Sequence, residues 1–189
     1  MQKYDVVLML DAWLSDSERK TLLQEVEKSL WKEITQKDEI GLRVLTHDLW
    51  GKSGQDKVYL YSYYIQAVPA DIAQFKKQRI YNKSIKKIHI YKMTNTEPFF
   101  TFAPLQEELT KVIEGWDAKK LWQKLVFFTD KRNTKYLNRK SVAMFKKYIT
   151  RFGEVKPRKY TGNSVSVQKK LREAILRARE LGLLSFTKK

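Results

Sequence analysis

The chain of 189 residues contains no cysteine and only two histidines, four prolines and seven glycines. Without cysteine it can form neither disulfide bonds nor a thiolate zinc site, which is compatible with a reducing cytoplasm. No apolar run approaches the roughly 18 residues of a membrane-spanning helix. The amino terminus has a short apolar run interrupted by Asp11 and no small-residue cleavage site. We therefore expect no metal site, no membrane association and no signal peptide.

Catalytic patterns are also missing. His47 and His89 are expected on two different strands, and nothing in the sequence places either beside a nucleophile or a pair of carboxylates. Gly51-Lys52-Ser53 is similar to the end of a phosphate-binding loop, but Thr46 stands where that motif needs glycine. The sequence therefore predicts neither an enzyme nor a cofactor.

Charge is distributed unevenly along the chain, whose formal net charge is +17. From Val126 to the end there are 18 Lys or Arg and four Asp or Glu, a net charge of +14, whereas the first 125 residues carry only +3. Since 42% of residues are hydrophobic and 31% charged, both parts should fold. A nearly neutral part joined to a strongly basic part indicates that the second part binds a polyanion.

The first part has the pattern of a split βαβ unit. Strands are predicted at 4–10, 39–49, 57–67 and 84–92. One helix should begin at the capping box of Ser15 and Glu18, and a second at Pro69. The first helix should bury Leu22, Leu23, Val26, Leu30 and Ile34. This order predicts an α+β fold, a ferredoxin-like four-stranded antiparallel sheet with two helices on one face and the other face open.

The third predicted strand has a row of aromatic residues on one face, Tyr59, Tyr61 and Tyr63, followed by Ile65. One interpretation is a platform on which RNA bases stack. The other is that the row packs beneath another part of the same chain. The low charge of this half and the lack of a run of Gly and Phe favour the second interpretation.

The middle of the chain is predicted to be a connector. Met93 to Pro104 interrupts the periodicity, and Leu105 to Leu125 has the pattern of an additional helix that docks. The run VFFTDKRNTKY is then expected to be an extended basic arm. Asn138 should cap the next helix, which buries Val142, Phe145, Ile149 and Phe152. The cations expected outside are Arg139, Lys140, Lys146, Lys147 and Arg151.

The stretch from Tyr148 to Phe186 predicts two helices around a stiff basic loop. Gly153 should end the first helix, Pro157 should fix the loop, and Ser164 should cap the second helix. The buried stripe predicted for the second helix is Leu171, Ala174, Ile175, Ala178 and Leu181. On a helical projection Lys170, Arg172, Arg177 and Arg179 border this stripe.

Several fixed spacings in this stretch resemble the carboxy-terminal half of small-subunit ribosomal protein eighteen. They are the run EVKPRKYTG, then Gln168, then AILRARELGLLSF, so that the resemblance extends from about Leu137 to Thr187. Glu154, Leu176 and Ser185 depart from the family pattern, and these three positions receive no family role.

The first part is similar to small-subunit ribosomal protein six, through YDVVLML and LWGK and through the length of each segment. Its connection between the second and third strands departs from that family, because SGQDKVYLY replaces the usual run. The two resemblances together predict a fusion of partner proteins. Its expected parts are a protein six-like domain at 1–95, a helical connector at 96–125 and a small all-α, protein eighteen-like domain at 126–189.

The resemblance implies a structural constituent of the small ribosomal subunit in the cytoplasm, with an organellar ribosome left open. Its implied partners are the central domain of small-subunit rRNA, neighbouring ribosomal proteins and, within the chain, contact between the two domains. The predicted rRNA-binding residues are Lys140, Lys147, Arg151, Arg158, Lys159, Lys169, Lys170, Arg172, Arg177 and Arg179. The alternatives are a helix-turn-helix-like DNA-binding regulator and an RNA-processing enzyme.

Overall fold

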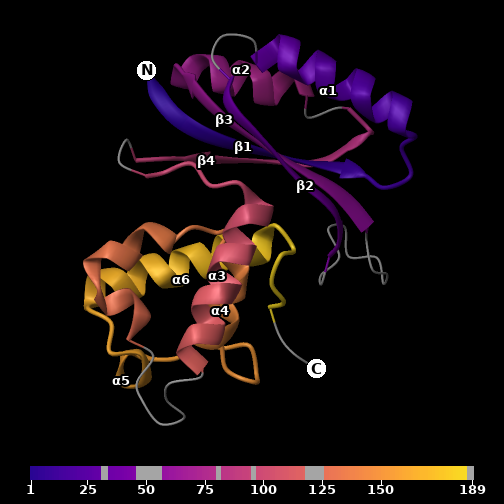
Figure 1. The fold of residues 1–189 in the computed structure, drawn as a ribbon. Coiled ribbons are helices and arrows are strands. Elements are labelled where there is room, and N and C mark those ends of the chain that lie inside the picture. The colour runs from indigo at the N-terminus through magenta and orange to yellow at the C-terminus, as the bar shows by residue number, and fades with distance from the viewer. Residues whose placement is uncertain (31–33, 46–56, 80–81, 95–96, 118–125, 187–189) are drawn as a thin grey trace. The chain divides into compact units, whose positions relative to one another are not determined.

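The structure, a computed structural model, describes residues 1–30, 34–45, 57–79, 82–94, 97–117 and 126–186. The chain forms two compact units (Figure 1). The first unit consists of Met1–Val44 and Lys57–Phe99. The second consists of Leu45–Asp56 and Phe100–Lys189. The helix predicted as part of a connector thus lies in the second unit.

The first unit is an antiparallel sheet with two helices. Its elements are β1 (Gln2–Asp11), α1 (Asp16–Leu30), β2 (Ile34–Val44), β3 (Lys57–Ala67), α2 (Pro69–Arg79) and β4 (Ile85–Lys92). The strand order is β2-β3-β1-β4, and each pair is antiparallel. Figure 1 shows α1 and α2 on the same face of the sheet. This is the predicted ferredoxin-like arrangement, which is confirmed.

The tyrosine row of β3 lies in the core of this unit. Tyr61 and Tyr63 are buried in a cluster with residues of β1, α1 and α2. Their hydroxyl groups donate hydrogen bonds to the carboxylates of Glu39, at 3.0 Å, and Glu27, at 3.3 Å. The row therefore packs beneath other parts of the chain, as the favoured interpretation had it, and these two rings offer no stacking platform.

The boundary between α1 and β2 differs from the prediction. The capping box is present, since the backbone N–H of Ser15 donates to Glu18 and the backbone N–H of Glu18 donates back to the Ser15 hydroxyl. However, α1 ends at Leu30, and Ile34 begins β2 instead of continuing the helix. The strand pairs along β3 across a bulge at Gly41, whose φ of 82° requires glycine. Residues 46–49 of the predicted strand lie outside the described residues.

The second face of the sheet, which the sequence predicted to be open, carries mostly apolar and aromatic residues. Val7, Met9, Leu60, Ser62 and Tyr64 point away from the helices and are all fully buried. Two contacts within the unit contribute to this burial: the ring of Phe99 packs on Tyr64 with centroids 4.6 Å apart, and Ser62 donates a hydrogen bond to Asp5 at 2.8 Å. The apolar residues of β1 and β3 thus lie on both faces of the sheet.

The second unit is helical. Its elements are α3 (Phe102–Asp117), the 3₁₀ turns η1 (Phe127–Thr129) and η2 (Lys131–Tyr136), α4 (Val142–Tyr148), α5 (Arg158–Thr161) and α6 (Val165–Glu180). Ser164 caps α6 by accepting a hydrogen bond from the backbone N–H of Val167 at 3.3 Å. The predicted buried stripe of α6 is confirmed at all five positions, Leu171, Ala174, Ile175, Ala178 and Leu181.

Two predictions for the second unit are wrong. The run from Val126 to Tyr136 is not an extended arm, because it coils into η1 and η2 around the buried rings of Phe128 and Tyr136. Helix α4 begins at Val142 and ends at Tyr148, so Ile149 and Phe152 are not on its buried face. Ile149 instead forms an isolated bridge with Val155, and Phe152 is 75% exposed.

Candidate nucleic-acid interface

The connection between α4 and α6 is held by one side chain, that of Gln168. Its amide nitrogen donates to the carbonyl oxygen of Lys156 at 2.8 Å. Its amide oxygen accepts hydrogen bonds at 3.1 Å from the buried side chains of Thr161 and Asn163. Because these hydrogen bonds join Lys156, Thr161 and Asn163 to α6 inside the unit, the loop that carries Arg158 and Lys159 has a fixed conformation.

The other end of the connection is held by Arg179. Its guanidinium group donates to the carbonyl oxygens of Gly153 and, at 3.1 Å, Ser185, and lies 5.8 Å from the ring centre of Phe186. Burial lowers the pKa of Arg179. This side chain is therefore committed to the fold, although the sequence predicted an RNA contact for it.

Five of the ten predicted rRNA-binding residues have exposed side chains. Among the described residues they have no hydrogen bond or ion pair through these side chains. They are Arg151, Lys159, Lys169, Lys170 and Arg172. Three of them lie on α6 and two on the connection that precedes it. These five cations, called the free-cation set below, are the part of the prediction that the geometry makes suitable for phosphate.

Three further predicted cations are exposed or half-buried and already have a partner. Arg158 donates to the carbonyl oxygen of Asn163 at 2.9 Å, and Arg177 forms an ion pair with Glu173 one turn earlier in α6. Lys147, on α4, is half-buried. A phosphate contact by Arg158 or Arg177 would compete with, or share, the bond that the side chain makes within the fold.

Lys140 and Arg139 are buried, so the prediction that both lie outside is wrong. Lys140 is 0% exposed, and its ammonium group donates to the carbonyl oxygen of Phe100 at 3.0 Å. Arg139 is 4% exposed, and burial, together with the charge of Arg177, lowers its pKa to about 9. The cause is the late start of α4, since residues 138–141 form a turn that points inward and not the first turn of a helix.

Several exposed cations of the second unit are not among the predicted rRNA-binding residues. Lys131, Arg132 and Lys135 are exposed on η2, and Lys146 is exposed on α4. The basic run from Lys131 to Lys135 could have indicated a cationic surface in the sequence. Because this run was expected to be an extended arm, its side chains could not be assigned to one face of a helix.

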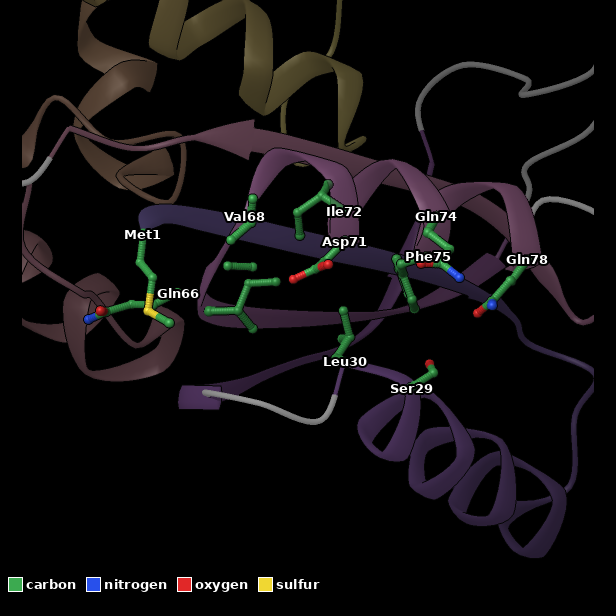
Figure 2. A pocket seen from close by; sticks show the side chains of 12 residues that line it. Met1, Ser29, Leu30, Gln66, Val68, Asp71, Ile72, Gln74, Phe75 and Gln78 are labelled. Carbon is green, nitrogen blue, oxygen red and sulfur yellow. The ribbon is translucent and has the colours of Figure 1, made fainter.

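Other parts of the structure offer no comparable chemistry. A hollow of about 160 Å³ lies in the first unit between the end of α1, β3 and α2, and Asp71 is the one ionisable side chain that lines it (Figure 2). Within the described ranges there is no cluster of His, Asp and Glu suited to a metal ion. His89 stacks on Tyr91 in β4, and His47 lies outside the described residues. No helix in the described part of the chain is long and apolar enough to cross a membrane.

A helical unit with a rigid loop and a surplus of exposed cations defines a small basic protein of the kind that binds polyanions. The sequence profile of the family described as ribosomal protein S18 matches residues 133–184. The small ribosomal subunit protein bS18 of Mycoplasma capricolum is 42% identical over 64 residues, which cover 34% of this chain and 85% of that protein. The chain belongs to the ribosomal protein S18 family, and the resemblance read from the sequence is confirmed.

A second relative and one solved structure are also similar to parts of the chain. The bS18 protein of Thermoanaerobacter sp. (strain X514) is 42% identical over 73 residues, 39% of this chain and 78% of that protein. The crystal structure of 30S ribosomal protein S6 from Thermotoga maritima superposes with a TM-score of 0.44 and 11% identity, over 59% of this chain and 97% of that chain. The ferredoxin-like fold of the first unit rests on its strand order and not on this likeness.

Proposed function

We propose that the chain is a structural constituent of the small ribosomal subunit, a fusion of two proteins that are ordinarily separate. Its second unit, a member of the S18 family, binds the central domain of small-subunit rRNA and aids assembly of that region. Its first unit is a protein six-like scaffold that contributes shape and protein contacts. Membership of the S18 family together with the free-cation set is the observation that carries the proposal.

The proposed mechanism is neutralisation of phosphates. A-form RNA hides the base edges of its deep groove, so a basic surface recognises mostly its backbone and shape. Each Lys or Arg that meets a phosphate releases counterions, which makes the affinity steeply dependent on salt. Among the described residues, the free-cation set has no acidic partner to break before it meets RNA.

Fusion also changes how the two units meet. Two separate partners must find each other by diffusion, whereas two linked ones share an effective concentration of about a millimolar if the linker spans their sites. The proposal therefore includes contact between the two units on the ribosome and with neighbouring small-subunit proteins.

The test compares RNA binding by the full chain with that of a variant in which the free-cation set is replaced by alanine. The probe is a transcript of the central domain of small-subunit rRNA, and the dissociation constant is measured over a range of salt concentrations. Each phosphate that the variant no longer neutralises should reduce the slope of log affinity against log salt by roughly 0.7 to 0.9. An unchanged slope would remove the assignment.

A matched control replaces five exposed lysines of the first unit, Lys20, Lys28, Lys76, Lys77 and Lys87. This variant removes the same number of charges but should keep the salt slope of the unaltered chain. If both variants reduce the slope equally, the binding reflects net charge alone and not the S18-like surface.

A DNA-binding regulator is less well supported. The connection between α4 and α6 runs from Ile149 to Ser164 and contains α5, whereas the turn of a helix-turn-helix motif has about 3 to 4 residues. A competition experiment between duplex DNA and the rRNA transcript distinguishes the two functions. The proposed function requires that the chain bind the transcript with higher affinity than duplex DNA.

A further inference from the structure

The connection between α4 and α6 carries two exposed aromatic rings, whereas several other aromatic rings of the second unit are buried. Phe152 is 75% exposed and Tyr160 is 59% exposed, whereas Phe128, Phe145 and Tyr148 are completely buried. The buried rings form the core of the unit. Phe152 and Tyr160 contribute little to that core, so their presence needs another explanation.

Both rings are attached to backbone that is held in place. Tyr160 lies in α5, where the N–H of Gly162 donates to the carbonyl of Arg158 at 2.8 Å and the side chain of Gln168 fixes the adjoining Thr161. Phe152 lies in a turn closed by the N–H of Gly153, which donates to the carbonyl of Thr150 at 3.1 Å. A ligand that binds these rings would therefore lose little free energy in ordering the chain.

Each ring directly follows an exposed cation in the sequence. Arg151 precedes Phe152, and Lys159 precedes Tyr160, and both cations belong to the free-cation set. A ring beside a cation matches the two parts of one nucleotide, because the base stacks on the ring while the cation meets the phosphate. A purely apolar partner would make no favourable contact with the cations, and a fully paired duplex would offer no unpaired base to stack on the ring.

We infer that Tyr160 and Phe152 are two platforms on which unpaired bases of RNA stack, with Lys159 and Arg151 binding the adjacent phosphates. This inference rests on the proposed RNA-binding function and adds to it a preference for loops or bulges over continuous duplex. Stacking tolerates any base, so the platforms select unpaired structure and not sequence.

The two platforms hold separate nucleotides. Arg179, in the last turn of α6, binds next to Phe152, and Asn163, just before the first turn, binds the side chain of Arg158 near Tyr160. The 16 residues of α6, which separate these two contacts, correspond to roughly 24 Å of helix. At such a distance the effects of removing each ring should be independent and multiply in the affinity.

The experiment uses the full chain and three variants, Tyr160→Leu, Phe152→Leu and Tyr160→Phe. Leucine keeps an apolar side chain but removes the ring, and phenylalanine keeps the ring. The probes are the central-domain rRNA transcript, which has loops and bulges, and a fully paired RNA duplex of similar length. Each leucine variant should bind the transcript roughly ten-fold more weakly at every salt concentration. Binding to the duplex and the affinity of Tyr160→Phe should not change.

Three outcomes would overturn the inference, and they differ in what they say of the proposed function. If the leucine variants bind the transcript like the unaltered chain, while replacement of the free-cation set still reduces the salt slope, only the stacking role fails. If the leucine variants assemble poorly into subunits but keep their affinity for the transcript, the rings meet protein. If the unaltered chain does not bind the transcript at low salt, the proposed function fails as well. Thermal unfolding should be the same for all variants, since both rings are exposed.

Discussion

The ammonium group of Lys140 donates a hydrogen bond to the carbonyl oxygen of Phe100 at 3.0 Å, and the Lys140 side chain is completely buried. The carbonyl oxygen of Lys140 itself accepts a hydrogen bond from Gln106 in α3. The residue thus ties the segment before α4 to the start of α3. The sequence predicted that Lys140 belongs to a basic surface, but in the structure it stabilises the interior of the second unit.

Replacing Lys140 by alanine should destabilise the protein without changing its response to salt. The variant would lose the hydrogen bond from the ammonium group to the carbonyl oxygen of Phe100 and the packing of a buried side chain, which together cost about 1 to 3 kcal/mol. The exposed Lys146 is the control, and its replacement by alanine should change the free energy of unfolding by less than about 0.5 kcal/mol. Thermal unfolding of the full chain and the salt slope of RNA binding are the two measurements. Unchanged stability with a reduced slope would mean that Lys140 contacts RNA after all.

Replacing Gly182 by alanine should destabilise the second unit by more than the free energy needed to hold alanine in a left-handed backbone conformation. Gly182 follows α6 with a φ of 66°, and a Cβ atom there would overlap Cδ2 of Leu45 and lie 3.3 Å from its Cα. The left-handed conformation alone costs about 1 kcal/mol for a residue other than glycine. Chemical denaturation measures the change, and an additional Leu45→Ala substitution should recover part of it.

The control for this prediction is Gly115, in α3, where a Cβ atom would have no neighbour within 4 Å. Alanine there should stabilise the helix by about 0.5 to 1 kcal/mol, because glycine is a poor helix former. Equal effects of the two substitutions would contradict the close packing between Gly182 and Leu45.

Replacing Gln168 by leucine should loosen the loop that precedes α6. The hydroxyl group of Thr161 and the side-chain amide nitrogen of Asn163 would each lose the oxygen that accepts their hydrogen bond, at a cost of about 1 to 3 kcal/mol for each group. We expect a lower unfolding temperature and weaker binding to the rRNA transcript, because Lys159 and Tyr160 would no longer be held in position. Ser166, exposed on the first turn of α6, is the matched control as Ser166→Ala. A Gln168→Leu protein with unaltered stability would show that the hydrogen bonds of this side chain are dispensable.

The stability of the first unit should fall at high pH through Tyr61. Burial, and then its hydrogen bond to Glu39, raise the pKa of Tyr61 from 10.0 to about 12. The folded state therefore keeps the phenol proton more tightly than the unfolded state does. This contribution is fully present below pH 10 and is lost as the pH rises to about 12. Denaturation of the full chain at several pH values should show this loss, and the loss should be smaller in Tyr61→Phe. An identical pH dependence in the two proteins would rule out Tyr61 as its source.

The elements that the sequence predicted well are those whose side chains repeat on one face. The buried stripe of α6 and the capping residues of α1 and α6 depend on residues within one or two turns, so local periodicity was sufficient. The burial of the tyrosine row was predicted from a lack of charge around it. The ferredoxin-like order followed from the succession of strand and helix patterns.

The errors arose where a distant residue decides the structure. Lys140 and Arg179 have the same chemistry as Lys170 and Arg172, and only the carbonyl groups of Phe100, Gly153 and Ser185 distinguish them. Most of those partners are far away in the sequence, so periodicity could not identify them. Similarly, α4 ends at Tyr148 because Ile149 pairs with Val155, a bridge that the helical pattern through Phe152 did not reveal.

Through Arg179, the segment that follows α6 supports the turn that carries Phe152, although this segment is not part of that turn. The guanidinium group of Arg179 joins Ser185, close to the end of the chain, to the turn at Gly153. A premature stop codon that deletes the residues after Glu180 would remove the Ser185 carbonyl that helps to hold the Arg179 side chain, and so would loosen the turn beside Phe152 even though every residue of the turn would still be translated.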